Sequence, residues 1–213
     1  MTSWKRATSW KRRTEFQSKR FRPYALSVGQ MNLTWNDFHE ALGTLFLKLM
    51  VDHPRKLRDL RRCRVLWGAI SSDREKRKLV EVLADNFDAT RYPTVPTLTE
   101  DLKFLVRRGH SLEDRRNDVI HAPVFLVNNA LVAGAMGVQC MDIVPSRFSA
   151  RGQRLKGPAH RAGRELLAAI RLYRDYAAAL SKYASDINDA WLARDTKRRR
   201  AWPRRPPLPP LKD

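Results

Sequence analysis

The sequence predicts an all-α protein, a four- to five-helix up-and-down bundle. Between the two ends of the chain, apolar residues recur at spacings of three and four, the period of an amphipathic helix. No glycine-rich phosphate loop follows an apolar run, so a nucleotide-binding α/β fold is not expected. We expect a basic, disordered leader over residues 1–23, one helical domain over 24–193, and a basic, proline-rich, disordered tail over 194–213.

The first two helical stretches are expected at residues 25–50 and 57–87, with a break in the second near Ser71-Ser72. The first has a broad apolar stripe, formed by Met31, Trp35, Phe38, Leu42, Leu45, Phe46 and Leu49.

Capping signals place the next two helices. Thr97 and Glu100 form a capping box, and the helix that they begin should stop at Gly109. Ser111 is then expected to cap a short helix that ends near His121, because a proline follows two residues later.

A small β-hairpin is expected after this helix, with strands at 124–127 and 130–133 around Asn128-Asn129. Residues 145–160 then form a basic loop, and a last long helix covers about 161–193. Its inner face consists of Leu166, Ile170, Tyr173, Ala177, Leu180, Ile187 and Trp191.

The net charge of +20 lies mostly in the two ends of the chain. Residues 1–23 carry eight basic side chains against one acidic one, and residues 194–213 carry eight against two. RNA, or alternatively DNA, is the natural partner of such a chain, because neutralising phosphates releases condensed counterions. A helical face that could follow phosphates, or be simply solvated, holds Arg55, Arg58, Arg61, Arg62 and Arg64.

Neither a cofactor nor a metal site is expected. Cys63 and Cys140 have no Cys or His partner at ligand spacing, so they are interpreted as reduced thiols. No apolar run approaches eighteen residues, so we expect no membrane span, and a cytoplasmic location is favoured. The basic leader leaves an organelle transit peptide open.

One segment carries residues suited to chemistry: Arg115, Arg116 and Asn117, followed by His121. It resembles the Arg-x4-6-His signature of the HEPN superfamily, all-α proteins that include many metal-independent ribonucleases. That family often has Asn directly after the Arg. Residues 35–40 also look like the opening helix of small bacterial members.

Helical geometry places Asn117 and His121 on one face, about 40° apart, and the long side chain of Arg116 can reach the same groove. The bare spacing also fits Arg154 and His160, but Gly157-Pro158 lies between them, so no single helix holds both.

The resemblance implies an endoribonuclease in which His121 transfers protons, Arg116 stabilises the phosphate and Asn117 orients the imidazole. Arg115 and Arg116 would bind RNA. It also implies a homodimer through the motif helix, and it leaves open a toxin or defence role with a cognate antitoxin or regulatory protein. Whether the chain cleaves RNA stays open. The alternatives are a non-catalytic helical nucleic-acid-binding protein, acting through basic tails and arginine-rich faces, and an interaction module.

Overall fold

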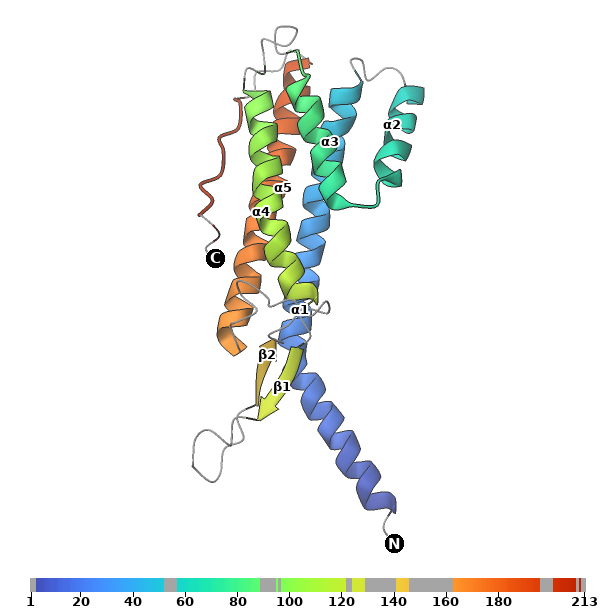
Figure 1. The fold of residues 1–213 in the computed structure, drawn as a ribbon, viewed down its shortest axis with the longest axis vertical. Helices are drawn as coiled ribbons and strands as arrows, with labels where there is room; N and C mark the ends of the chain where they lie inside the picture. The colour runs from blue at the N-terminus through green and yellow to red at the C-terminus, as the bar shows by residue number, and fades with distance from the viewer. Residues whose placement is uncertain are drawn as a thin grey trace. The chain divides into compact units, whose positions relative to one another are not determined.

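The computed structural model describes residues 3–51, 57–88, 95, 97–121, 124–128, 141–145, 163–195, 201–209 and 211. Over these residues the chain is an all-α helical bundle with one short antiparallel strand pair, as the sequence predicts (Figure 1). The elements are α1 (Ser3–Met50), α2 (Leu57–Ala69), α3 (Asp73–Asp85), α4 (Leu98–His121), β1 (Val124–Asn128), β2 (Met141–Pro145) and α5 (Gly163–Asp195). None of the described helices is long and apolar enough to cross a membrane.

The chain forms two compact units. The first contains Met1–Met31, Asp114–Tyr173 and Lys212–Asp213, and the second contains Asn32–Glu113 and Arg174–Leu211. Helices α1, α4 and α5 supply residues to both units. The single domain over 24–193 stays a prediction.

Each unit has its own apolar core. In the first, the buried side chains include Met31, Val119, Leu166, Ile170 and Tyr173. In the second, helices α1 to α5 all supply them, and examples are Trp35, Phe38, Leu42, Leu45, Phe46, Cys63, Trp67, Val80, Ala84, Leu98, Leu102, Leu105, Leu180, Ile187 and Trp191. Both predicted apolar stripes are therefore confirmed, except that Leu49 is only half-buried. Removing such side chains from water is the main force that holds the helices together.

The break predicted near Ser71-Ser72 separates α2 from α3. Ser72 is the N-cap of α3, and its hydroxyl accepts a hydrogen bond from the backbone nitrogen of Glu75 at 3.4 Å. Asp73 and Glu75 lie in the first turn, where the helix dipole favours negative charge.

Helix α4 corrects the prediction of two separate helices. It begins after Thr97 as expected but continues through Gly109 to His121. A Cβ at residue 109 would lie 2.8 Å from Cδ of Arg77 and 3.0 Å from Cε1 of Phe38. Gly109 therefore permits close helix packing and does not end the helix. Ser111 is not an N-cap either, because its hydroxyl donates to the carbonyl of Arg107 within the same helix at 3.2 Å.

The hairpin prediction is half right. β1 is found where expected, but its partner is β2, with Val124 opposite Pro145 and Asn128 opposite Met141. Asn128 is therefore a strand residue and not the first residue of a tight turn, and Asn129 and the strand expected at 130–133 lie outside the described residues. β2 holds adjacent β-branched residues, Ile143 and Val144, which fit a strand better than the alanine-flanked run at 130–133.

The disorder expected at the two ends of the chain stays a prediction, and the described residues there form a helix at one end and side-chain hydrogen bonds at the other. α1 begins at Ser3 and continues through Pro23. Residues 3–22 favour a helix because they include no glycine or proline and many strong helix formers. At the other end, residues 201–209 have no helix or strand, as expected, but Trp202 and Arg205 are hydrogen-bonded to Asp101 of α4.

Candidate functional site

The predicted motif lies on the last two turns of α4. Arg116 and Asn117 are both half-buried, and Nη1 of Arg116 donates a hydrogen bond to Oδ1 of Asn117 at 3.0 Å. Arg115 is 9% exposed, so its guanidinium offers a phosphate little surface, and Arg116 is the better candidate for that contact. His121 is the last residue of α4, and its side chain lies outside the described residues. Its role therefore stays a prediction.

The end of α4 is held by a residue that the sequence analysis did not single out. The hydroxyl of Tyr24 donates to the carbonyl of Val119 at 3.1 Å, and burial raises the pKa of this phenol. The last four carbonyls of a helix have no partner within it, and that of Val119 is one of them. Tyr24 thus satisfies a carbonyl two residues before His121. It was missed because it adjoins the expected leader and has no motif of its own.

A second cluster of polar residues lies inside the other unit, centred on Arg77 of α3. Arg77 is fully buried, and its guanidinium lies 5.2 Å from the ring centroid of Trp35. Its Nη2 forms an ion pair with Glu113 at 2.7 Å and lies 3.4 Å from Nδ1 of His110. Its Nη1 donates to Nε2 of His39 at 2.9 Å.

These contacts fix the protonation of both imidazoles, because an arginine can only donate. Nε2 of His39 must therefore accept, and the ring's proton is on Nδ1, which donates to the carbonyl of Trp35 at 3.1 Å. By the same argument Nδ1 of His110 accepts, so its proton is on Nε2. Both rings are neutral.

Burial is the main cause of this neutrality. It lowers the pKa of His39 to about 4, although Asp73 raises it, and it also lowers the pKa of His110, with Arg77 adding to the effect. Burial lowers the pKa of Arg77 as well, and Glu113 opposes that shift. At neutral pH His39 is thus a buried hydrogen-bond acceptor that is unsuited to proton transfer.

His39 packs among aromatic side chains: it is 5% exposed and contacts the rings of Trp35 and Phe38. Helix α4 continues past His110, whose Nδ1 lies 3.4 Å from Nη2 of Arg77. Arg77 itself was missed, because nothing in the sequence distinguishes a buried arginine from an exposed one.

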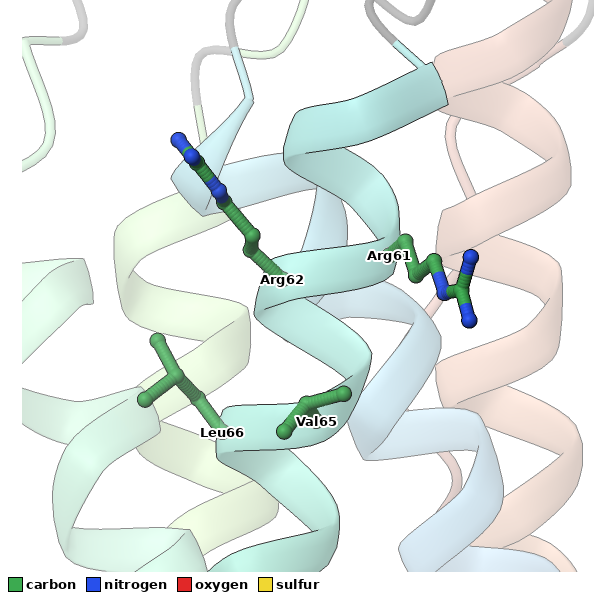
Figure 2. A pocket seen from close by; sticks show the side chains of 4 residues that line it. All are labelled: Arg61, Arg62, Val65 and Leu66. Carbon is green, nitrogen blue, oxygen red and sulfur yellow. The ribbon is translucent and has the colours of Figure 1, made fainter.

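The outer surface of α2 carries the described part of the arginine-rich face. Arg61, Arg62 and Arg64 are exposed, and next to them Val65 and Leu66 are 66% and 54% exposed. A pocket is lined by Arg61, Arg62, Val65 and Leu66, and Figure 2 shows the two guanidinium groups extending from α2 in different directions. Cys63 and Trp67 lie on the opposite, buried face of the helix.

Within the described ranges, no group of three or more His, Cys, Asp or Glu side chains is arranged to hold a metal ion. No protein-family model, curated protein or solved structure matches this chain.

Proposed function

We propose that this protein is a metal-independent endoribonuclease of the HEPN type that uses Arg116, Asn117 and His121. The observation that carries the proposal is the continuity of α4. One unbroken helix holds all three residues, so the spacing argued from the sequence applies to them. Arg116 and Asn117 are in contact on this helix, as a shared groove requires.

The chemistry needs few groups. A base removes the proton of a ribose 2′-hydroxyl, the oxygen attacks the adjacent phosphorus, and an acid protonates the leaving 5′-oxygen. The products are a 2′,3′-cyclic phosphate and a 5′-hydroxyl. A guanidinium stabilises the charge on the phosphorane, which is the role of Arg116.

Asn117 keeps a role in orienting His121. Its Oδ1 accepts from Arg116, and its Nδ2 group is a donor that can hold one imidazole nitrogen. One His cannot easily serve as base and acid in the same step. A homodimer that brings two α4 helices together would supply the second imidazole.

Cleavage of labelled RNA in the presence of EDTA tests the proposal. We expect 2′,3′-cyclic phosphate products from the unaltered chain and a loss of at least 100-fold with His121→Ala, the scale of general acid–base catalysis. Arg116→Lys should lose less activity than Arg116→Ala, because it keeps the charge without the bidentate geometry.

Arg107→Ala is the matched control, since Arg107 is an exposed arginine on the same helix outside the motif. Full activity of His121→Ala, with an unchanged circular-dichroism spectrum, would rule the proposal out.

The arginines of α2 favour a second candidate function, non-catalytic binding of RNA or DNA. Arg61, Arg62 and Arg64 are exposed within four residues, and the chain has a net charge of +20. This candidate predicts binding without cleavage products in the same assay.

A further inference from the structure

Asp101 of α4 is a buried carboxylate that receives its hydrogen bonds from a distant segment. It is 2% exposed. Nε1 of Trp202 donates to its Oδ2 at 2.8 Å, and Nε of Arg205 donates to its Oδ1 at 2.6 Å. The hydroxyl of Thr97 donates to Oδ2 at 2.9 Å. A buried carboxylate with these donors is a built binding site for a cation and an indole N–H.

Aromatic residues form the wall of this site. The guanidinium of Arg205 lies 5.7 Å from the ring centroid of Phe104, and Phe104 meets Tyr183 edge-on at 5.9 Å. Burial raises the pKa of Tyr183, so its hydroxyl stays protonated beside the carboxylate. The site, which we call the Asp101 site, thus combines one negative charge with ring faces that suit a guanidinium.

The segment that occupies the Asp101 site, residues 202–205, is held there by the side chains of Trp202 and Arg205 and has no regular secondary structure. Within the described part of the chain, the backbone hydrogen bond of this segment runs inside it, from Leu208 to Pro206. The side chain of Arg205 is still 43% exposed in its ion pair. A segment attached in this way can be exchanged for another that presents the same two groups.

The sequence contains one other segment of that kind. Residues 202–205 read Trp-Pro-Arg-Arg, and residues 10–13 read Trp-Lys-Arg-Arg. Of the six tryptophans, Trp10, Trp191 and Trp202 have an arginine three residues after them, and Trp191 is buried in the core, which leaves Trp10 as the alternative. Residues 10–13 belong to α1, where positions three apart lie on one side of the helix.

We propose that the Asp101 site recognises a tryptophan followed three residues later by an arginine, and that residues 10–13 of a second copy of this chain compete with residues 202–205 for it. The second copy is the natural source because α1 is one continuous helix from Ser3 to Met50. It therefore does not present residues 10–13 on a flexible tether. The C-terminal segment, which is tethered close to α5, then limits self-association by occupying the site first.

Sedimentation velocity on the full chain tests this. Trp202→Ala combined with Arg205→Ala vacates the site, and we expect the dissociation constant for self-association to fall at least tenfold. Adding Trp10→Ala and Arg13→Ala should restore the wild-type value. Adding Trp4→Ala and Arg6→Ala instead is the matched control, because Trp4 has no arginine three residues after it, and the tighter association should persist.

A second measurement does not depend on the vacated variant. A labelled peptide of residues 8–15 should bind the unaltered chain saturably, and at least tenfold more weakly to Asp101→Asn, which keeps the shape of the side chain and removes its charge. A peptide with Trp10 and Arg13 replaced by alanine should not bind.

Unchanged association of a folded vacated variant would overturn the proposal, as would equal loss in the Trp4 control or equal peptide binding to Asp101→Asn. None of these readouts involves RNA cleavage.

Discussion

At the scale of single residues, the most informative side chain is His39. It accepts a hydrogen bond from Arg77 and donates one to the carbonyl of Trp35, so a proton on Nε2 would face a guanidinium. Protonating His39 therefore requires the loss of the contact with Arg77. The neutral imidazole of His39 and the guanidinium of Arg77 stabilise the fold through their hydrogen bond, and the stability that this bond contributes depends on pH.

We predict that the free energy of unfolding falls as the pH is lowered from about 6.5 to about 4. The unfolded chain takes up a proton on His39 near 6.5, whereas the folded chain does not until about 4, so acid favours unfolding across this window. The loss is on the order of 3 kcal/mol. Urea denaturation at several pH values measures it.

His39→Gln is the control for this prediction. It cannot titrate, so it should be less stable at neutral pH but show a shallower decline down to pH 4. Parallel pH profiles for the two proteins would contradict the assignment.

At the scale of elements, close helix packing explains why α4 passes through a glycine. We predict that Gly109→Ala destabilises the protein by about 1 kcal/mol. An added Cβ would lie 2.8 Å from Arg77 and 3.0 Å from Phe38, and overpacking typically costs about 1–3 kcal/mol. The higher helix propensity of alanine offsets about 1 kcal/mol of this overpacking cost.

Gly29→Ala is the matched control, because a Cβ at residue 29 meets nothing within 4 Å. It should stabilise α1 slightly. Thermal unfolding of the two variants compares them directly, and equal effects at both positions would contradict the packing argument.

The end of α4 gives a second prediction at this scale. Tyr24→Phe removes the hydroxyl that satisfies the carbonyl of Val119, which should cost about 1 kcal/mol. Hydrogen exchange of the amides at residues 118–121 should accelerate, and RNA cleavage should fall with it. Ser111→Ala, which removes an exposed hydroxyl bonded to the same helix, should leave exchange there unchanged. Unaltered exchange in Tyr24→Phe would show that this bond does not hold the helix end.

At the scale of the whole molecule, the net charge of +20 predicts RNA binding that weakens steeply with salt. Replacing Arg61, Arg62 and Arg64 with Gln should lower the slope of log affinity against log salt by about 2, at roughly 0.7 per phosphate contact on a single strand. Filter binding at several salt concentrations measures this.

The control replaces three exposed arginines from three different segments, Arg107 of α4, Arg171 of α5 and Arg204 of residues 201–209, with Gln. It removes the same charge and should change the slope less. An equal change would mean that overall charge, and not the face of α2, determines binding.

Periodicity and capping chemistry were enough to predict the all-α class, both apolar stripes, the break at Ser72 and the start of α4, because these features depend on neighbours three or four residues away. The sequence also brought Arg116 and Asn117 together on one helix, and the structure has them in contact.

Tertiary packing alone decided the rest. In the sequence Gly109 has the features of a helix end, and only its close approach to Arg77 and Phe38 explains a glycine there. The hydrogen-bond partner of Tyr24 is 95 residues away, and Trp202 and Arg205, which donate to Asp101, are more than 100 residues away. The buried state of Arg77 likewise depends on residues from two other helices, α1 and α4. Local spacing determines which face of a helix is apolar, but it contains no information about which distant backbone or charge will meet that face.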